Sequence, residues 1–490
     1  MDWTLIAAAV YLVSLIIPFI MLVFVPVNRR PSSATAWLLL IFMFPFLGLI
    51  AFLLLGSPKL SVKRRLQQRA MDELVRKEVE ALRQVPELAA LVDPPLEQRY
   101  APFVRLNTNL GGLPACGGNR VELIADYQGA LDAITAEVDR AREFVHLEYF
   151  IICRDRTTEG LFQALERAVQ RGVKVRVLLD HLGSLVYPGF RKLVPRLRAA
   201  GIEAYVMLPV RIFDNEWSRA DLRNHRKIVI VDGEVGFTGS QNIIDRTYHK
   251  RRNLRRGLYY DELVARVEGP VVAQLQAVFI TDWFSETGTL LDRTAAPEIW
   301  KLPRARGTSL CQVLPSGPGH ENENNLKLFT SLIYAAQRSV VICNPYFVPD
   351  DALMTAITSV AQRDVDVRLV LSEIGDQFMV FHAQRSYYEQ LLRCGVKIYL
   401  YRAPVLLHSK SISIDDDIAV VGSSNMDIRS FELDLEVTLV CYDPQVVREL
   451  RAIEAGYIER SRQLTLDEWI RRPRLTQFVD NMMRLTSALQ

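Results

Sequence analysis

Two stretches of the sequence decide the fold: HRKIVIVDGEVGFTGSQN at residues 225–242 and HSKSISIDDDIAVVGSSN at residues 408–425. Both read H-x-K-x4-D followed by G-S-x-N, with the same spacing and no gap. An acidic residue also stands eight positions before a proline in each half, Glu262 before Pro270 and Glu436 before Pro444. One H-x-K would be a weak signal, but two copies at this fidelity indicate an internal duplication.

The alternation after each histidine predicts a β-strand. Residues two apart on a strand share a face, so the paired polar side chains of each motif project together. Duplicated modules usually associate about a pseudo-twofold axis, and we therefore expect two His, two Lys and two Asn in one cleft. The pairs that share a face are His225 with Lys227, His408 with Lys410, Ser240 with Asn242, and Ser423 with Asn425.

Such a cleft is cationic and rich in hydrogen-bond donors, which suits a phosphate group. Lys and Asn can stabilise charge on the phosphoryl oxygens of a transition state. Because imidazole titrates near neutrality, one imidazole can attack phosphorus while the other protonates the leaving oxygen. Glu262 and Glu436 are candidates to orient the imidazoles through their second nitrogen. Asp232 and Asp415 end the strands and are expected to fix the following turns.

Other chemistries find less support. Lysine is not a usual metal ligand and the cluster lacks ligand spacing, which disfavours a metal site. No G-x-x-x-x-G-K-[ST] loop occurs, so a nucleotide-binding P-loop is unsupported. The cysteines stand singly, and we expect small buried residues rather than disulfides or zinc ligands at all six. They are Cys116, Cys153, Cys311, Cys343, Cys394 and Cys441.

From about residue 105 the chain alternates amphipathic helices with β-branched runs such as GVKVRVLLD (172–180) and VDVRLVLS (365–372). This is the pattern of βα units around a largely parallel sheet, and it predicts an α/β fold. We expect a transmembrane helical hairpin at 1–58 and a charged helical connector at 59–104. Two tandem modules would follow at 105–300 and 301–490, the second ending in an amphipathic helix.

The N-terminal prediction rests on two runs without charge, at 3–27 and 34–55. Each exceeds the roughly 20 residues that cross a bilayer as a helix, and membrane helices tolerate Pro18 and Pro45. A cleaved signal peptide fits poorly, since no basic segment precedes the first run and no small-residue cleavage site follows it. A buried hairpin of a soluble protein is the other alternative to a membrane hairpin.

Charge predicts the orientation in the membrane. A basic cluster follows the second run and should stay in the cytoplasm: Lys59, Lys63, Arg64, Arg65 and Arg69. A hairpin returns the chain to its starting side, so we expect a multi-pass inner-membrane protein with cytoplasmic modules. The 49% hydrophobic content of the 490 residues excludes a disordered chain or a small disulfide scaffold. The net charge of +3 argues against nucleic-acid binding through bulk charge.

The doubled motif resembles the signature of the phospholipase D superfamily. Longer stretches, among them VHLEYFIICRD, NPYFVPDDALMTAI and the tail LTLDEWIRRP, resemble bacterial cardiolipin synthases of the phospholipase D type over nearly the whole chain. The resemblance implies two α/β modules with mixed sheets flanked by helices and one active site between them. It also implies a reaction: one phosphatidylglycerol gives its phosphatidyl group to a His, releasing glycerol, and a second takes that group to form cardiolipin.

The resemblance further implies that neither metal nor nucleotide takes part, and that the partners are phosphatidylglycerol, cardiolipin and the bilayer, without nucleic acid. The assembly state is left open, with a homo-oligomer as one option. Carried over by position, Asp232 and Asp415 support a catalytic set, and Ser240, Ser423 and the two Glu would assist substrate binding. That set is His225, Lys227, Asn242, His408, Lys410 and Asn425.

The family usually assigns the nucleophile to the first-half histidine, here His225, with His408 as general acid and base. The duplication leaves these roles interchangeable from the sequence alone. The first half also departs from the family pattern: it reads YYDELVARVEG, where Glu262 holds the acidic place and Asp261 adjoins it. Which of the two carboxylates orients a His is left open.

Two further segments allow two interpretations each. The basic run is either a solvated loop or a contact for anionic lipid headgroups: Lys250, Arg251, Arg252, Arg255 and Arg256. The tail lies either on the bilayer interface or against the second module, with apolar residues at helical spacing: Trp469, Leu475, Phe478, Met482 and Leu485. Glu148 and Tyr149 are expected to support the cleft wall.

Three other functions compete with phosphatidyl transfer. A membrane-bound phospholipase D-type hydrolase would use the same residues and differ only in the acceptor, which would be water. A catalytically dead scaffold is disfavoured because His and Lys are intact in both copies. A nucleic-acid phosphodiesterase is disfavoured by the apolar N-terminal runs and the nearly neutral charge.

Overall fold

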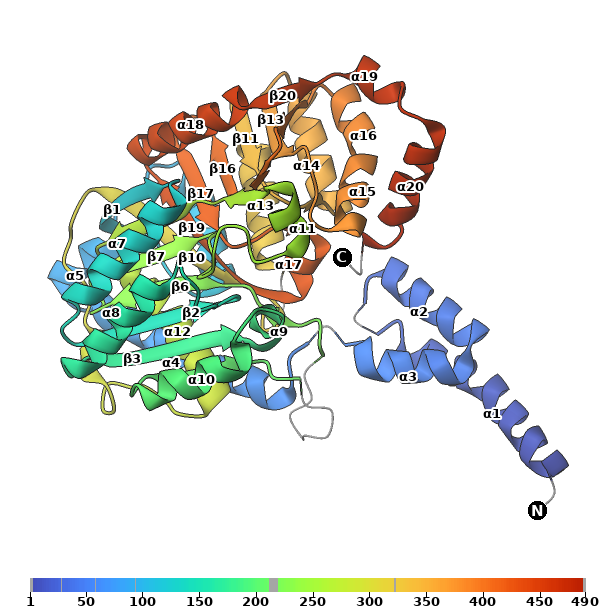
Figure 1. Cartoon of the computed structure of the whole chain (residues 1–490), viewed down its shortest axis with the longest axis horizontal. Coiled ribbons are helices and arrows are strands. Elements are labelled where there is room, and N and C mark those ends of the chain that lie inside the picture. Colours follow the sequence, from blue (N-terminus) through green and yellow to red (C-terminus); the bar gives the residue numbers. More distant parts are fainter. Residues whose placement is uncertain are drawn as a thin grey trace. The chain divides into compact units, whose positions relative to one another are not determined.

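The computed structural model describes residues 3–27, 29–57, 59–92, 94–210, 219–320 and 323–487. The chain divides into two compact units, Met1–Lys59 and Leu60–Gln490. Each is described separately. Figure 1 shows the three helices of the first unit in blue.

The first unit holds one helix that is long and apolar enough to cross a membrane, α1 (Trp3–Phe24). The second apolar run differs from the expected uninterrupted span, because it forms α2 (Pro31–Met43) and α3 (Pro45–Leu55). The helix stops at Phe44, since Pro45 has no N–H and disfavours helical geometry in the residue before it. With 13 and 11 residues, α2 and α3 are about 20 and 17 Å long, well short of a hydrocarbon core of about 30 Å.

These two short helices fold back on one another. The Trp37 ring of α2 lies 5.5 Å from the Phe52 ring of α3. Nearer the bend, Gly48 lies so close to the Ile41 backbone that a Cβ would not fit there. Trp37 pairs with Phe52 and Ile41 with Gly48, so later residues of α2 contact earlier residues of α3. The two helices therefore form an antiparallel hairpin.

The second unit is built on one hydrogen-bonded sheet that runs through both copies of the repeat (Figure 1). The sequence predicts a mixed sheet in each module. In the structure the two halves form one mixed sheet, joined where β1 (Cys116–Ile124) pairs with β10 (Ser309–Ser316). Outward from β1 the first half continues with β9 (Val264–Glu268), β7 (Val235–Gly239), β6 (Lys227–Val231), β2 (Phe144–Tyr149), β3 (Lys174–Asp180) and β4 (Glu203–Met207).

Outward from β10 the second half repeats that order with β19 (Asp434–Tyr442), β17 (Ile418–Gly422), β16 (Ser411–Ile414), β11 (Ser339–Cys343), β13 (Asp366–Ser372) and β14 (Lys397–Tyr401), and β20 (Ser461–Leu464) closes the edge. The pairing directions match as well: β2–β3–β4 and β11–β13–β14 are parallel, and the strands nearer the junction are antiparallel. The sheet therefore has the pseudo-twofold arrangement that the doubled motif predicts.

Two short strands cross between the halves. In the first half β5 (Arg223–Asn224) pairs in parallel with β19 of the second half. In the second half β15 (Val405–Leu407) pairs in parallel with β8 (Tyr259–Asp261) of the first. Each of these strands directly precedes a motif histidine, so each half places its histidine against the other half.

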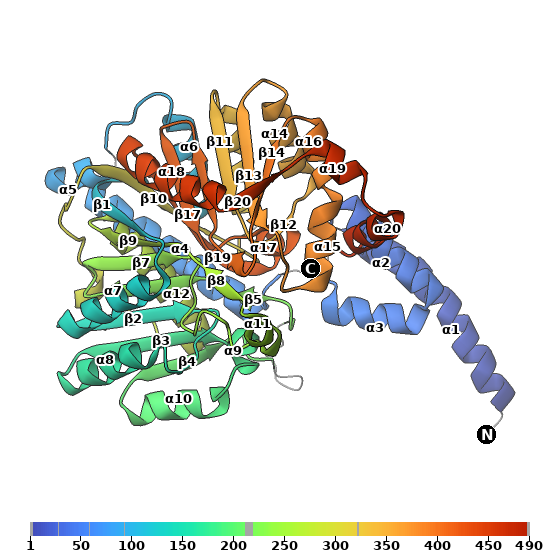
Figure 2. The ribbon, with the colours of Figure 1, turned by 45° about the horizontal axis from the view of Figure 1, so that its top comes forward.

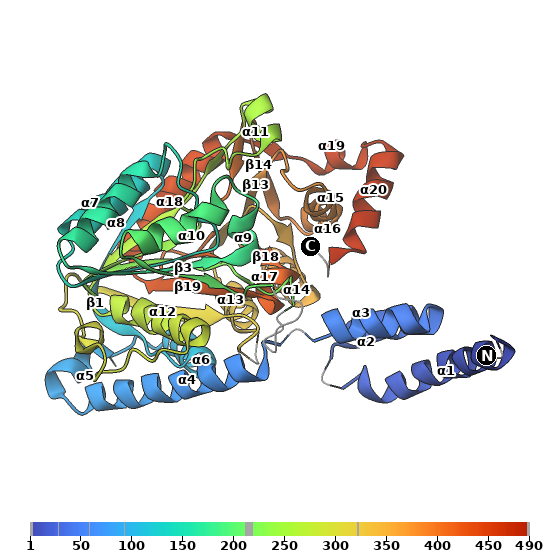
Figure 3. The same cartoon turned by 60° about the horizontal axis from the view of Figure 1, so that its bottom comes forward.

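Helices cover both faces of the sheet. Figure 3 shows α7 (Tyr127–Arg140) and α8 (Glu159–Gln170) on one side of the first half and α12 (Val271–Thr287) on the other. Successive residues of β2 point to opposite faces of the sheet, so each face buries its own set. Val145, Leu147 and Tyr149 join the core with α7 and α8, while Phe144 joins the core with α12. Connector helices α4 (Val62–Arg83), α5 (Pro86–Val92) and α6 (Ala101–Gly111) pack on the same compact unit.

The remaining helices of the first half are α9 (His181–Leu185), α10 (Phe190–Ala199) and α11 (Arg251–Arg256), with a 3-10 turn at Pro297–Trp300. The second half has α13 (Asn324–Ala335), α14 (Asp351–Ala361), α15 (Phe378–Ser386), α16 (Tyr388–Arg393), α17 (Ile428–Glu432), α18 (Pro444–Glu459), α19 (Leu466–Ile470) and α20 (Arg474–Arg484). It also has a small pair of strands, β12 (Phe347–Val348) and β18 (Met426–Asp427). Five of the six cysteines are buried, and Cys394 is half-buried.

The Asp and the Gly that both copies of the repeat share are explained by the local backbone geometry. Asp232 and Asp415 turn the chain at φ values of 52° and 48°, in the left-handed region that Asp tolerates better than most residues. A Cβ at Gly239 would collide with the Leu263 carbonyl, and one at Gly422 with the Val437 carbonyl. The glycine of each G-S-x-N is therefore required by the close approach of the neighbouring strand.

Candidate active site

The backbone fixes both motif histidines at the boundary between the halves. The His225 N–H donates to the Leu435 carbonyl at 2.8 Å, and the His408 N–H donates to the Asp261 carbonyl at 2.7 Å. These bonds continue the crossed pairings of β5 and β15. Both histidines are buried, with 8% and 6% of their surface exposed.

Each imidazole pairs with a carboxylate of the other half. Nδ1 of His225 lies 2.9 Å from Oε1 of Glu436, and Nδ1 of His408 lies 2.8 Å from Oε1 of Glu262. The structure thus places Glu262, not Asp261, against an imidazole. Asp261 instead accepts a hydrogen bond from the Tyr401 hydroxyl at 2.8 Å. With Nδ1–H donating to the carboxylate, Nε2 of a neutral ring keeps its lone pair, whereas a His–Glu pair that has taken up one further proton carries that proton on Nε2.

Hydroxyl groups hold the two carboxylates in place. Glu436 accepts from the Ser423 hydroxyl and, at 2.9 Å, from the Ser430 hydroxyl. Glu262 accepts from the Tyr248 hydroxyl at 2.7 Å, and the Ser240 hydroxyl also favours its charged form. Ser240 and Ser423 are predicted to assist substrate binding; in the structure their hydroxyls face the carboxylates and the neighbouring strands. Leu263 N–H donates to Ser240 at 2.9 Å, and Val437 N–H donates to Ser423 at 3.0 Å.

The motif lysines lie beside the histidines, as residues two apart on a strand should. Nζ of Lys227 donates to the His225 carbonyl at 2.5 Å, and Nζ of Lys410 donates to the His408 carbonyl at 2.8 Å. Nζ of Lys410 also lies 3.3 Å from both ring nitrogens of His408. Both lysines are almost fully buried, at 1% and 3% exposure, so bulk water does not surround their amino groups.

The electrostatics couple the two halves into one site. Burial lowers the pKa of both imidazoles well below 6.5, and lysine charges from both motifs lower it further: Lys410 acts on His225 and Lys227 acts on His408. Burial raises the pKa of Glu262 and of Glu436 to about 7. Each His–Glu pair can therefore take up or release one proton near neutral pH, and that titration belongs to the pair rather than to one residue.

The two motif asparagines are not equivalent. Asn242 is satisfied within the protein, because its Oδ1 accepts from the Ile151 N–H at 3.1 Å and its Nδ2 donates to the Tyr248 hydroxyl at 3.1 Å. Asn425 has a buried Oδ1 that takes no partner among the described residues. The same letter of the repeat therefore has different hydrogen-bond partners in the two halves.

Asp232 and Asp415 lie at the far ends of β6 and β16 from the histidines. The Asp232 carboxylate accepts from the backbone N–H groups of Arg142, Glu143 and Phe144 at 2.9, 2.8 and 2.9 Å. The Asp415 carboxylate does the same for Gln337, Arg338 and Ser339 at 3.0, 2.7 and 2.9 Å. Each therefore fixes the start of the neighbouring strand rather than only its own turn.

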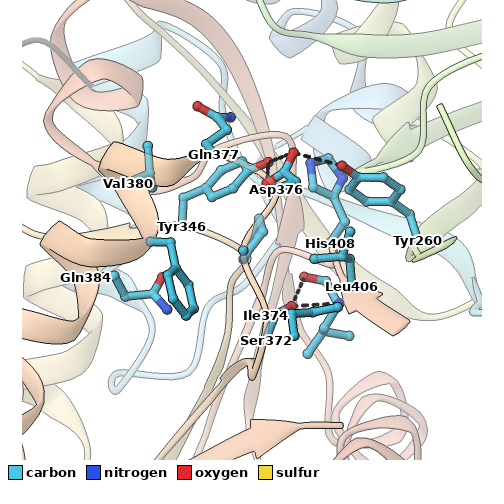
Figure 4. Close-up of a pocket in the computed structure, with 14 residues that line it drawn as sticks. Tyr260, Tyr346, Ser372, Ile374, Asp376, Gln377, Val380, Gln384, Leu406 and His408 are labelled. Carbon is cyan, nitrogen blue, oxygen red and sulfur yellow. Dashed lines mark hydrogen bonds between the residues drawn. The ribbon is translucent and has the colours of Figure 1, made fainter. Parts of the chain in front are cut away.

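A polar pocket beside His408 escaped the sequence reasoning (Figure 4). Asp376 accepts hydrogen bonds there from the hydroxyls of Tyr260 at 2.8 Å and Tyr346 at 3.0 Å. The ring centroids of these tyrosines lie 5.4 and 6.0 Å from that of His408. Burial opposes the charge on Asp376, but Lys250 at 2.6 Å and the hydroxyls outweigh it and lower the pKa. No repeated letter marks Asp376, so motif comparison could not find it.

The other predicted residues lie around this site. Lys250, from the basic run, contacts the pocket through Asp376, whereas the four arginines of the run are exposed on α11. Glu148 is buried and accepts from Nδ2 of Asn224, the neighbour of His225, at 2.9 Å. Tyr149 packs in the core under α7 and α8. Elsewhere Cys153, Asp155 and His249 bring ligand-type atoms within 4.8 Å of one another, but His249 and Asp155 already pair at 2.8 Å.

Comparison with known proteins gives the family. Residues 134–283 and 329–454 match the family described as "Cardiolipin synthase, PLD-like domain". The chain belongs to this family. Residues 6–57, which include most of α1 and all of α2 and α3, match the family "Phospholipase_D-nuclease N-terminal". The two copies of the family domain carry the two motif strands, and they match the two halves of the sheet.

Whole-length relatives carry the family's name. The chain is 35% identical over 472 residues to cardiolipin synthase A of Proteus mirabilis, with 94% of each chain covered. It is 32% identical over 464 residues to cardiolipin synthase A of Pectobacterium carotovorum, again with 94% of each covered. Among solved structures, phosphatidylserine synthase of Haemophilus influenzae aligns with a TM-score of 0.59 at 15% identity, over 81% of this chain and 100% of that one. That likeness shows the fold.

Proposed function

We propose that this protein is a cardiolipin synthase that transfers a phosphatidyl group from one phosphatidylglycerol to another. Membership in the family makes the chain a phosphatidyltransferase that acts on phospholipids. One observation carries the proposal for the site: two buried imidazoles, each paired with a carboxylate from the other half, stand beside two buried lysines. That arrangement supplies a nucleophile, an acid and two cations for a phosphoryl group.

In the first step, Nε2 of His225 attacks the phosphorus of a phosphatidylglycerol. The P–N bond forms as the bond from phosphorus to the headgroup glycerol oxygen breaks, and His408 gives that oxygen a proton. Glycerol leaves, and the phosphatidyl group stays on His225. Lys227 and Lys410 offset the charge on the phosphoryl oxygens. We assign the attack to His225 because the hydroxyls of Tyr260 and Tyr346, with Asp376, lie beside His408, where they can orient the leaving glycerol.

In the second step, the terminal glycerol hydroxyl of another phosphatidylglycerol attacks the same phosphorus. His408 takes the hydroxyl proton, the P–N bond breaks, and cardiolipin is formed. One phosphodiester is broken and one is made, so the exchange needs no external energy source. The proton shared by His408 and Glu262 is released to one alcohol and recovered from the next, which returns the site to its starting state.

The direct test uses purified protein with phosphatidylglycerol as the sole substrate. Cardiolipin together with free glycerol supports transfer. Phosphatidic acid as the main product would instead identify a hydrolase, and no turnover would point to a scaffold. Phosphatidylglycerol labelled in its acyl chains tests the nucleophile. We expect the label to stay covalently attached to the His408→Ala variant but not to the His225→Ala variant.

The protein is a membrane protein, and we propose that residues 60–490 lie on the cytoplasmic side. The basic cluster that begins at Lys59 supports this orientation. The lengths of the apolar helices favour one crossing by α1, with the α2–α3 hairpin entering and leaving the same face. That arrangement replaces the two crossings that the charge-free runs predict.

A further inference from the structure

Helix α20 is amphipathic, with its apolar side turned outward. Leu475, Phe478, Met482 and Leu485 are spaced three, four and three residues apart, which places them on one face of a helix. They are exposed by 75%, 61%, 42% and 78%, respectively. An ordinary surface helix buries such a face against its own core, so this one lacks a partner among the described residues. We refer to these four residues as the α20 face.

The opposite side of α20 is fixed to the body of the protein by a buried acid. Asp480, at 1% exposure, pairs with Nδ1 of His382 at 2.7 Å and with Arg472 at 2.5 Å. His382 belongs to α15, and α20 lies beside α15 in both views (Figure 1, Figure 2). Trp469, just before α20, packs in the core of the second half. Trp469 therefore packs inward, as expected for a tail that packs against the second module. The four residues of the α20 face instead point outward.

Two more exposed apolar side chains lie on α15, the helix that α20 packs against. Phe378 and Met379 at the start of α15 are exposed by 60% and 40%. Their neighbours Gln377, Val380 and Phe381 line the pocket beside His408 (Figure 4). Exposed apolar side chains thus stand next to the rim of that pocket, on the helix against which α20 packs.

We propose that the α20 face, with Phe378 and Met379, docks on a bilayer containing anionic phospholipid and brings the pocket beside His408 to the membrane. The charges fit this occupant, because Arg471 and Arg474 are exposed at the N-terminal end of α20 while Asp480, the acid of α20, is buried. The chain also carries an apolar helix able to cross a membrane, so a bilayer is always near. The role in substrate entry rests on the proposed function; the docking itself does not.

Photocrosslinking measures the docking without any turnover. The full-length protein is reconstituted in phosphatidylglycerol vesicles with a diazirine amino acid at position 478 or, as control, at Lys192 of α10. In both views α10 lies at the far end of the second unit from α20 (Figure 1, Figure 2). We expect lipid adducts at 478 to exceed those at 192 by about tenfold or more. Equal adducts, or adducts at 478 with a second protein chain, would overturn the proposal.

Activity in two lipid formats tests the link to substrate entry. Phe478→Asp and Asn481→Asp each add one negative charge to α20, inside and outside the α20 face, respectively. On vesicles we expect Phe478→Asp to lower kcat/KM about tenfold and Asn481→Asp to leave it nearly unchanged, with both near wild type on detergent-dispersed lipid. Equal rates of the two variants on vesicles would overturn the link. If the wild-type protein turned over neither format, the proposed function would fail while the crosslinking result stood.

Discussion

His408 lies 2.8 Å from Glu262, a carboxylate that belongs to the other copy of the repeat. The carboxylate fixes which ring nitrogen carries the proton and stabilises the imidazolium that forms during proton transfer. Glu262→Gln keeps the shape but not the charge, and the Gln side chain can also turn an N–H towards the ring. We expect kcat for cardiolipin formation to fall about 10³-fold to 10⁴-fold, as for comparable His–carboxylate pairs.

The neighbouring residue provides the matched control for that variant. The Asp261 carboxylate contacts Tyr401 and Arg246 rather than the imidazole. Asp261→Asn should therefore stay within a few-fold of the wild-type kcat. A similar loss in both variants would mean that general disturbance of this strand, and not the His–Glu pair, controls turnover.

A second prediction concerns Asp415, whose carboxylate serves three backbone N–H groups at the start of β11. Asp415→Ala leaves these donors without their charged acceptor and places an alanine at a positive φ. We expect the free energy of unfolding to fall by about 2–4 kcal/mol. Because the site itself is untouched, kcat measured well below the unfolding temperature should change less than about twofold. A large loss of kcat in fully folded protein would show that Asp415 acts in catalysis as well as in folding.

A third prediction follows from the buried ammonium of Lys227. Burial lowers the pKa of Lys227 from 10.5 to about 7. Between these values the unfolded chain binds more protons at this residue than the folded protein does, so its contribution to stability rises with pH. From pH 7 to pH 9 this gain is about 2 kcal/mol.

Lys227→Met should remove that gain, and the difference is measured as the unfolding free energy in detergent at the two pH values. Lys192→Met, at an exposed position on α10, is the control and should keep the wild-type dependence. An unchanged pH dependence in Lys227→Met would show that the ammonium is better solvated than its 1% exposure indicates.

A fourth prediction tests the pocket beside His408. Tyr346→Phe removes a hydroxyl that donates to Asp376 at 3.0 Å, next to the space proposed for the glycerol headgroup. We expect kcat/KM for phosphatidylglycerol to fall by about tenfold. Tyr100→Phe is the control, since that buried hydroxyl takes no partner among the described residues. Equal effects of the two changes would argue against a headgroup site in this pocket.

A fifth prediction concerns the number of membrane crossings. If α1 crosses once and α2–α3 returns to the face that it entered, reporters fused to the two ends of the chain will lie on opposite sides of the membrane. Protease or thiol-label accessibility in intact cells measures this. Both reporters on the same side would favour the two crossings that the sequence predicts.

Residue spacing predicted what depends on short-range geometry. The i, i+2 relation placed each Lys beside its His, and the duplication predicted a shared site. The crossed His–Glu pairs could not be predicted, because they depend on β5 and β15 joining strands of the other half. The role of Asp232 also depends on a distant partner, the strand start at Phe144. A charge-free run such as 34–55 does not show whether Pro45 bends a helix or ends it, since that depends on the packing of Trp37 against Phe52.

The exchanged strands β5 and β15 have a consequence for how such a protein could arise. A chain with one copy of the repeat would carry a histidine whose carboxylate partner lies in a second copy. Only a symmetric pair of such chains would form both His–Glu contacts. Fusion of two copies makes that pairing permanent and lets the sequences diverge. One histidine could then acquire surroundings suited to alcohols, as the tyrosines around Asp376 suggest, while the other kept its role in attacking phosphorus.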